Sequence, residues 1–262
     1  MRKLGMVAGL MAGIGMLALG CDTPPVGPEL VDGTLRTEAS TKKLDSEVCS
    51  TANPGFRTTS THPYFPFMAG DQWYYEGEED GEPVSLLITV LDQTRVIDGV
   101  ETLVIEEREW EDDELLEVSW NYFAQAADGT VCYFGEDVDI FEDEEISHEG
   151  AWCAEEAGSM PGIFMPADPQ PGMKYQTEFG PGAQDQVKIV GSGLVTVPYG
   201  TFPETIRWRE FNPVDGDKGY KVFAEGLGLV IDESLLLIDL EEDASAPGPP
   251  IPTDQSCGDV NG

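Results

Sequence analysis

The stretch from Leu115 to Glu136 constrains the fold more than any other part of the chain. Apolar residues occupy every second position from Leu116 to Ala126, and most positions between them are polar. This period of two is typical of a β-strand with one face toward a core. The dipeptide Asp128-Gly129 then predicts a two-residue type I′ turn. We therefore predict a β-hairpin in which Phe123 lies opposite Phe134.

Strand patterns of the same kind recur at short spacing along the chain. Turn sequences at Asp98-Gly99 and Glu111–Glu114 separate the strands of the first half, and no stretch beyond about ten residues has a helical period. The segment Ser147–Met173 contains four prolines and breaks this rhythm, so we predict a Pro-rich loop that covers one end of the sheet. The predicted fold is all-β: an antiparallel meander of about ten strands that forms a curved sheet, half-barrel or barrel.

The balance of charge limits the partners that suit this chain. Among 262 residues, 50 are Asp or Glu and 14 are Lys or Arg, which gives a formal net charge of −36. Nucleic acids and anionic lipid head groups are poor electrostatic partners for such a chain, whereas cations and basic proteins suit it. An acidic surface also keeps an exported protein soluble and monomeric without any specific ligand.

The N-terminus has the order of a secretory signal peptide. Arg2 and Lys3 precede an apolar run from Leu4 to Leu19, and a small residue follows the run. A membrane-spanning helix needs roughly 20 apolar residues, and no second run of that length occurs downstream. We predict a signal peptide over residues 1–20.

The end of this run resembles the lipobox of bacterial lipoproteins. It reads Leu17-Ala18-Leu19-Gly20-Cys21, with Ala18 where that family usually has Leu. The resemblance implies that Cys21 is acylated, for example with palmitate, and becomes the first residue of the mature protein. It also implies an exported protein anchored to the cell membrane or the outer membrane, facing the periplasm or the exterior. An ordinary cleaved secretory signal with a chance cysteine is the alternative.

Composition divides the remaining chain into three parts. Residues 21–48 contain several Pro, Ser and Thr residues without an apolar period, so we predict a flexible tether behind the acylated cysteine. Residues 49–242 are predicted to form a single β-rich domain. Residues 243–262 form a Pro/Gly-rich tail, which Cys257 could tie back to the domain.

Five short strings within the predicted domain resemble those of an uncharacterised family of secreted bacterial proteins and lipoproteins. The strings are Pro63–Phe67 (PYFPF), Trp120–Gln125 (WNYFAQ), Tyr133–Glu136 (YFGE), Pro161–Ala167 (PGIFMPA) and Val197–Phe202 (VPYGTF). The resemblance implies one extracytoplasmic β-rich domain and carries over no catalytic residue. The chain departs from the family at two cysteines, Cys132, where the family tends to have Trp, and Cys153.

Four cysteines remain when Cys21 is set aside as the lipid site. An even number in an exported chain predicts two disulfides. Of the three possible pairings we favour Cys132–Cys153, which would pin an acidic loop to the hairpin, and Cys49–Cys257, which would tie the two ends of the domain. A zinc site is the alternative, but the sequence has no C-x-x-C spacing.

No sequence motif of a known enzyme class is present. The chain lacks G-x-S-x-G, P-loop, H-E-x-x-H and G-x-G-x-x-G motifs. Its two histidines are His62 and His148, and His148 beside Glu149 lacks an accompanying nucleophile. We predict a non-enzymatic protein, and keep a hydrolase with a carboxylate site as an alternative that no motif supports.

The predicted role is to bind a ligand or partner at the cell envelope. A curved sheet rich in aromatic residues, covered by the Pro-rich loop, could hold an apolar small molecule or lipid. The candidate ligand-binding residues are Trp73, Trp120, Tyr122, Phe164 and Met165. A basic protein of the envelope is the other partner that the charge favours.

A calcium-binding structural or interaction lipoprotein is the second hypothesis. Asp137, Asp139 and Glu142 could supply oxygen ligands for Ca²⁺, although the order of an EF-hand loop is missing. No other cofactor is expected. Met160, Met165 and Met173 could bind Cu(I) through their thioethers, but packing explains these residues more simply.

Overall fold

The computed structural model describes residues 41–142, 145–242, 244, 257 and 259–260. The predicted signal peptide, the acylation site Cys21, most of the tether and most of the C-terminal tail lie outside the described residues. Within them, no helix has the length and apolar character needed to cross a membrane. One short 3₁₀ helix, η1 (Ser46–Cys49), lies near the start of the described chain.

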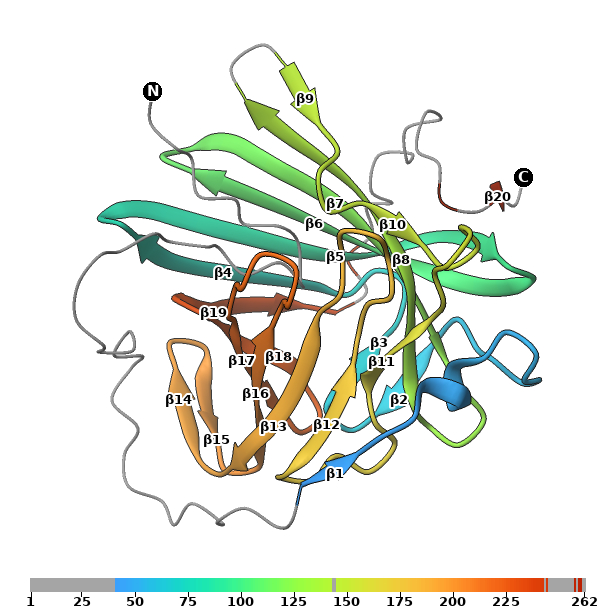
Figure 1. Cartoon of the computed structure of the whole chain (residues 1–262). Coiled ribbons are helices and arrows are strands. Elements are labelled where there is room, and N and C mark those ends of the chain that lie inside the picture. The colour runs from blue at the N-terminus through green and yellow to red at the C-terminus, as the bar shows by residue number, and fades with distance from the viewer. Residues whose placement is uncertain (1–40, 143–144, 243, 245–256, 258, 261–262) are drawn as a thin grey trace.

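A single sheet of 16 strands dominates the structure (Figure 1). In chain order its strands are β1 (Lys42–Lys43), β4 (Gln72–Glu79), β5 (Glu82–Ile97), β6 (Val100–Glu111), β7 (Glu114–Gln125), β8 (Val131–Glu142), β9 (Glu145–Ser147), β10 (Trp152–Cys153), β11 (Gly162–Met165), β12 (Met173–Gln176), β13 (Gln186–Ser192), β16 (Thr205–Phe211), β17 (Tyr220–Ala224), β18 (Gly228–Asp232), β19 (Leu235–Glu241) and β20 (Asp259–Val260). Two separate hairpins are β2 (Ser60–His62) with β3 (Phe65–Phe67), and β14 (Val195–Val197) with β15 (Gly200–Phe202).

The order of strands shows two meanders joined side by side. It runs β1-β12-β13-β16-β17-β18-β19-β4-β5-β6-β7-β8-β10, while β9 and β11 pair with β8 and β20 pairs with β5. The pairing of β1 with β12 is parallel, and the other pairings are antiparallel. The all-β prediction is confirmed. The sheet is mixed, has more strands than the expected ten or so, and is not closed into a barrel.

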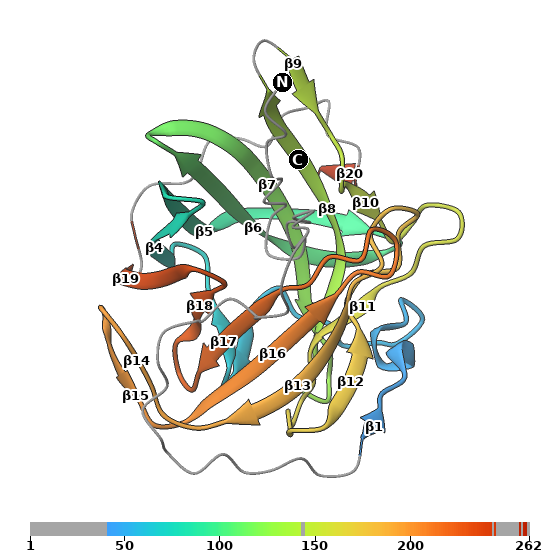
Figure 2. The same ribbon diagram turned by 60° about the vertical axis from the view of Figure 1, so that its left-hand side comes forward.

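The sheet curves until its two halves face each other (Figure 1, Figure 2). An aromatic core packs between them. We call the face that carries this core the inner face. Phe123 of β7 packs against Phe164 of β11, with ring centroids 4.9 Å apart, and Phe164 packs against Trp208 of β16 at 5.0 Å. Phe65 of β3 contacts Phe164 at 4.4 Å. The core therefore joins both meanders and the β2–β3 hairpin.

Local turn chemistry explains the long hairpins of the first meander. Asp98 and Gly99 have φ of 46° and 80°, and Asp112 and Asp113 have φ of 50° and 65°. Two consecutive residues with positive φ form a type I′ turn, whose twist matches that of the flanking strands. Both predicted turns are therefore confirmed.

The hairpin of β7 and β8 has a different turn from the one predicted. Ala126 N donates to Thr130 O at 2.8 Å and Gly129 N donates to Ala126 O at 3.0 Å, which leaves a three-residue loop closed by Gly129 at φ 101°. The register near the turn is shifted by one residue, so Phe123 lies opposite Tyr133 rather than Phe134. A β-bulge beyond Asn121 then returns the strands to the register of a two-residue turn.

The Pro-rich segment is part of the sheet rather than a covering loop. β10 and β11 both lie within it and pair with β8, and the side chains of Phe164 and Met165 are fully buried. Gly162 allows this packing, because a Cβ at this position would lie 1.9 Å from Thr177 O. Short apolar strands between prolines can add to a sheet edge. The irregular sequence of this segment gave no strand period from which β10 and β11 could be predicted.

The disulfide prediction is correct for the four cysteines and wrong for their pairing. The bonds are Cys49–Cys132 and Cys153–Cys257. Cys153 lies opposite Gly135 in the β8–β10 pair, three positions from Cys132, a separation of roughly 10 Å along a strand. A disulfide requires Cα atoms within about 7 Å, so the favoured pairing could not form.

Candidate functional site

The five predicted ligand-binding residues belong to the packed interior. Trp73 Nε1 donates to Leu227 O at 3.0 Å, Trp120 Nε1 to Glu106 Oε2 at 3.0 Å, and Tyr122 OH to Asp137 Oδ2 at 2.6 Å. Trp120 and Tyr122 lie on the face of the sheet opposite to the one on which Phe123 packs against Phe164, because successive residues of a strand alternate. The structure does not gather these five side chains around one space.

The predicted calcium ligands are used in other contacts. Asp137 Oδ2 accepts from Tyr122 OH and, at 3.4 Å, from the backbone N of Cys257, and Asp139 lies 3.1 Å from His148 Nδ1. The side chain of Glu142 lies outside the described residues. Over the described part of the chain, no group of three or more His, Cys, Asp or Glu side chains is arranged to hold a metal ion.

The two histidines have structural contacts. His62 is buried, its Nε2 lies 2.9 Å from Pro166 O, and its Nδ1 accepts a hydrogen bond from Tyr64 N. These contacts require the neutral tautomer with the proton on Nε2. Burial lowers the pKa of His62, consistent with a neutral ring that fixes the β2–β3 hairpin to the chain after β11.

The strongest concentration of chemistry is a set of buried charged residues on the inner face, beside the aromatic core. We call it the acidic cluster. Its members are Glu107, Glu109, Glu117, Glu136, Glu178, Asp185, Glu210, Lys221 and Asp232, each at most 8% exposed. Acids are almost never buried to this extent without a partner, so such a cluster points to a specific role.

Strand register brings one half of the acidic cluster together on β6, β7 and β8. Glu109 lies directly opposite Glu117, and Glu107 lies opposite Ser119. Glu136 lies opposite Asn121, whose Oδ1 accepts from Tyr133 OH at 2.6 Å. Alternation along each strand places these side chains on the same face as the aromatic core.

The other half of the acidic cluster comes from the second meander and surrounds one ammonium group. Lys221 of β17 lies opposite Asp232 of β18, and its Nζ donates to Asp232 Oδ1. Glu210 Oε2 lies 3.8 Å from the same nitrogen. Glu178 and Asp185 lie in the connection between β12 and β13. The cluster therefore already holds one cation between carboxylates.

The environment changes the protonation of these groups. Burial, and then the charges of neighbouring acids, raises the pKa of Glu109, Glu136 and Glu178 well above the usual range. Burial raises the pKa of Asp185 to about 7. Burial acts to lower the pKa of Lys221, but Asp232 and Glu210 outweigh it, so the pKa is raised and the ammonium stays charged.

Several polar atoms of the cluster have no hydrogen-bond partner among the described residues. They include Glu136 Oε2, Glu178 Oε1, Asp185 Oδ1 and Glu210 Oε1. Three aromatic donors beside them are also unused, namely Tyr175 OH, Trp152 Nε1 and Trp208 Nε1. Trp152 lies opposite Glu136 in the sheet, and Trp208 is two residues from Glu210 on β16. A buried site with unused acceptors and donors suits a small polar ligand.

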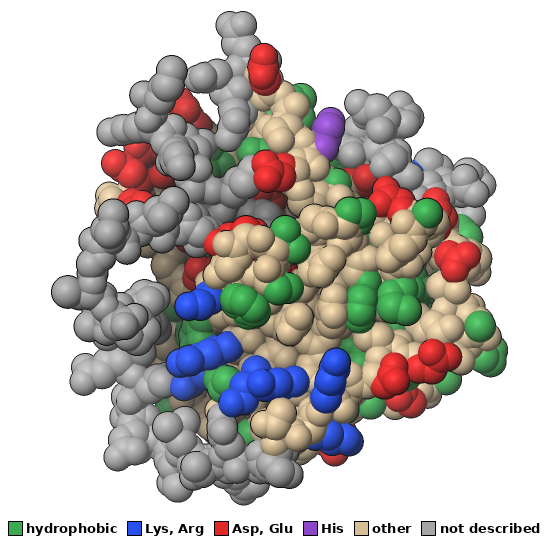
Figure 3. Space-filling view, viewed as in Figure 1, with side chains coloured by type: hydrophobic (Ala, Val, Ile, Leu, Met, Phe, Trp, Pro, Cys, Tyr) green, Lys and Arg blue, Asp and Glu red, His purple; other side chains and the backbone are tan. Residues whose placement is uncertain are grey.

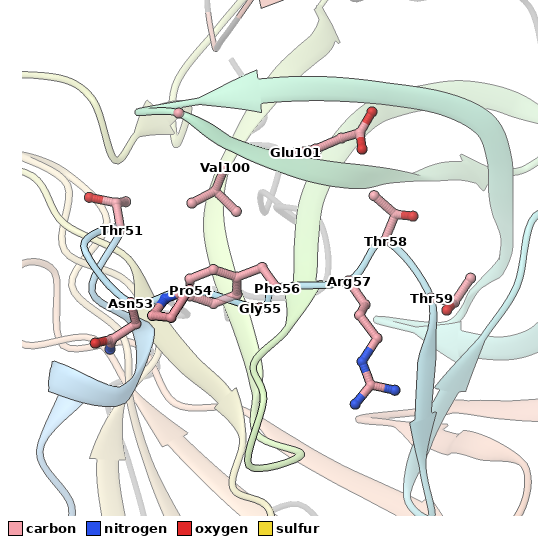
Figure 4. A pocket seen from close by; sticks show the side chains of 11 residues that line it. Thr51, Asn53, Pro54, Gly55, Phe56, Arg57, Thr58, Thr59, Val100 and Glu101 are labelled. Carbon is pink, nitrogen blue, oxygen red and sulfur yellow. The ribbon is translucent and has the colours of Figure 1, made fainter.

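A separate surface pocket of about 560 Å³ lies between the chain before β2 and the β5–β6 turn (Figure 4). Phe56 and Arg57 line one side, and Val100 and Glu101 line the other. Phe56 packs edge-to-face against Phe134 at 5.5 Å, so its position is set by the core. No residue of this pocket was a predicted site residue.

The acidic cluster was not predicted, because acidic residues occur along the whole chain. The available signal was local: Glu107, Glu109 and Glu117 stand in strands that also carry buried apolar residues on both faces, such as Val104 and Ile105 of β6. A strand covered on both faces buries whatever residues it carries.

Comparison with known proteins identifies no relative of this chain. No protein-family model matches the chain, and no curated protein and no solved structure is significantly similar to it. The functional assignment therefore depends on the chemistry of the acidic cluster.

Proposed function

We propose that this protein is an exported, lipid-anchored, monomeric β domain that binds an amine-bearing ligand in the acidic cluster and catalyses no reaction. The observation that carries the proposal is the coordination of Lys221 Nζ by Asp232 and Glu210 inside a group of eight acids. The remaining acids offer acceptor oxygens to a second ammonium or guanidinium group, whose charge would favour their ionised form.

A polar ligand fits the interior better than the apolar ligand first predicted. The predicted apolar site residues pack in the interior, whereas the acidic cluster has carboxyl oxygens without partners. A metal ion fits less well, because the described acids are not arranged as a set of three or more ligands. An amine of a small molecule or of a basic envelope protein satisfies the unused acceptors.

Binding can be tested by thermal unfolding with spermidine, with Ca²⁺ and with an uncharged sugar. A ligand at 100 times its dissociation constant stabilises a protein by about 2.7 kcal/mol, which raises the melting temperature by several degrees. We expect this rise with spermidine, and no rise with Ca²⁺ or with the sugar. Glu178→Gln should weaken spermidine binding about tenfold, a change of about 1.4 kcal/mol.

The matched control is Glu114→Gln, which removes an exposed acid in the β6–β7 turn and should leave binding unchanged. A larger rise with Ca²⁺ than with spermidine would favour the calcium hypothesis. No rise with either probe would remove the acidic cluster as a cation site.

Export and acylation rest on the resemblance of residues 17–21 to a lipobox, and on two disulfides, which persist in oxidising compartments. The test is labelling of the full chain with tagged palmitate in a bacterial host. Label and membrane association should be present in the native chain and absent from Cys21→Ser. Label in neither chain would contradict acylation.

A hydrolase is the second candidate, favoured by one observation. Glu136 has a raised pKa and lies among other acids, an arrangement that general acids use. Turnover of an envelope polymer that Glu136→Gln abolishes, and Glu114→Gln does not, would replace the binding proposal.

A further inference from the structure

A row of basic side chains crosses the second meander of this highly acidic protein. Lys43 of β1 lies opposite Lys174 of β12, Lys174 lies opposite Lys188 of β13, and Lys188 lies opposite Arg209 of β16. We call these four residues the basic row. Figure 3 shows Lys and Arg side chains gathered over these strands, while the acidic side chains lie mostly elsewhere on this view.

This arrangement does not serve the stability of the sheet. Neighbouring strands lie about 4.8 Å apart, and like charges directly opposite each other are destabilising. The chain has 50 acids that could alternate with these bases. Among the described residues, no ion pair involves Lys43, Lys174 or Arg209. The exposed charges of these three residues suit an anionic partner.

The outer face of β16 extends the basic row with groups suited to a lipid surface. Arg207 lies two residues before Arg209 and stands 5.6 Å over the ring of Tyr220. Phe211 lies two residues after Arg209, on the same face, and is 43% exposed. Basic side chains beside an exposed aromatic ring are typical of surfaces that lie on membranes.

The position of β1 connects the basic row to the N-terminal anchor. Lys42–Lys43 is the first strand described, and 20 residues lie between its first residue and Cys21. A tether as flexible as its composition predicts would have an r.m.s. reach of about 25 Å over this length. Acylation of Cys21 would therefore keep the end of the basic row close to the bilayer and raise its effective concentration there.

We propose that the basic row docks the domain on the anionic phospholipid head groups of the membrane that carries its anchor. This inference rests on the proposed lipid anchor for its location. The net charge of −36 does not oppose docking, because charges beyond a Debye length of about 8 Å are largely screened at physiological salt. The charge of the surface that touches the bilayer therefore determines whether the domain binds. The lipid phosphates accept hydrogen bonds from the Lys and Arg side chains of the basic row.

The test uses the full chain with Cys21→Ser, which carries no acyl group, and sedimentation with lipid vesicles. We compare phosphatidylcholine vesicles with vesicles containing about one third phosphatidylglycerol. Binding to the anionic vesicles should be at least about tenfold stronger and should weaken as salt is added. Lys174→Glu/Arg209→Glu should abolish this preference.

The control is Arg57→Glu, the same type of charge reversal at an exposed residue outside the basic row. Far-UV circular dichroism checks that each variant is folded. Equal binding to both kinds of vesicle, or an equal loss of binding in the control, would overturn the proposal. Because the test chain carries no acyl group, its result is independent of whether Cys21 is acylated, and the palmitate experiment tests the anchor separately.

Discussion

The acidic cluster and the basic row place charged side chains in opposite environments, one buried and the other on the surface. The acidic cluster buries eight acids on the inner face, where burial raises the pKa of five of them and Lys221 pairs with Asp232 and Glu210. The basic row keeps four cations in register on the outside of the second meander. Net charge predicts neither arrangement, because it says nothing about where each sign lies. Neighbouring residues therefore set the charge state of the buried acids, whereas binding partners interact with the charge of the surface bases.

Loss of Lys221 should have the largest effect on the free energy of unfolding. Lys221→Met leaves Asp232 and Glu210 buried without their counter-ion, and breaking a buried ion pair costs about 3–5 kcal/mol. Urea unfolding at pH 7 measures the change. Lys174→Met in the basic row is the matched control and should stay within about 0.5 kcal/mol. Equal losses of unfolding free energy in the two variants would show that Lys221 in the acidic cluster contributes no more to stability than Lys174 in the basic row.

Stability should fall as pH rises through the range in which Asp185 of the acidic cluster and the neighbouring Glu233 release their protons. The pKa of Asp185 rises from 3.8 to about 7 on folding, and that of Glu233 rises from 4.5 to about 7. Between these values the folded state binds more protons than the unfolded state, so stability is full below about pH 4 and is lost toward pH 7. Urea unfolding at pH 5 and pH 8 should give the higher free energy of unfolding at pH 5.

Asp185→Asn is the control for the pH dependence. Each unit by which a pKa is raised corresponds to about 1.4 kcal/mol, and Asn cannot titrate. The variant should therefore lose less stability between pH 5 and pH 8 than the native chain. An identical pH dependence would exclude Asp185 as a source of the slope.

Replacement of a buried acid that has one unpartnered oxygen should stabilise the protein at alkaline pH. Glu136 is buried, and its Oε2 has no partner among the described residues. Glu136→Gln removes the charged form, so we expect a gain of about 1–3 kcal/mol at pH 8 and a smaller change at pH 5. Thermal unfolding at the two pH values measures this, with exposed Glu114→Gln expected to be neutral. A loss of stability at pH 8 would mean that Glu136 has a stabilising charged partner.

The smallest effect is expected in the basic row. Lys174→Glu places an acid between Lys43 and Lys188, and opposite charges across strands contribute about 0.2–1 kcal/mol. Thermal unfolding at low salt should show a slightly higher melting temperature, and about 1 M salt should remove the difference. A lower melting temperature at low salt would show that the row is not repulsive.

Local features of the fold were predictable where backbone conformation alone decides them. Asp98-Gly99 forms the turn that its sequence predicts, because both residues tolerate positive φ. The same reasoning failed at Asp128-Gly129, where only Gly129 has positive φ and the loop has three residues. The paired strands beyond the turn, with a bulge past Asn121, determine which loop is compatible with the hairpin.

Partners far apart in the chain were not predictable. Bonding of the four cysteines follows from their even number, but the Cys49–Cys132 and Cys153–Cys257 pairs depend on which strands flank β8. Gly135 illustrates the point, because its missing side chain leaves room for Cys257 Sγ, 3.0 Å from where a Cβ would lie. No spacing rule in the sequence encodes that contact.

The sequence by itself determined the strand period, the tight turn at Asp98-Gly99 and the all-β class, because each depends on a few adjacent residues. Tertiary structure alone decided the two sites. The acidic cluster exists because the β16–β19 meander is joined to the β4–β8 meander through β19 and β4, so that both inner faces share one interior. The basic row exists because β1 pairs with β12, far along the chain. Strand neighbours distant in sequence are chosen by burial of the whole sheet, which no local pattern records.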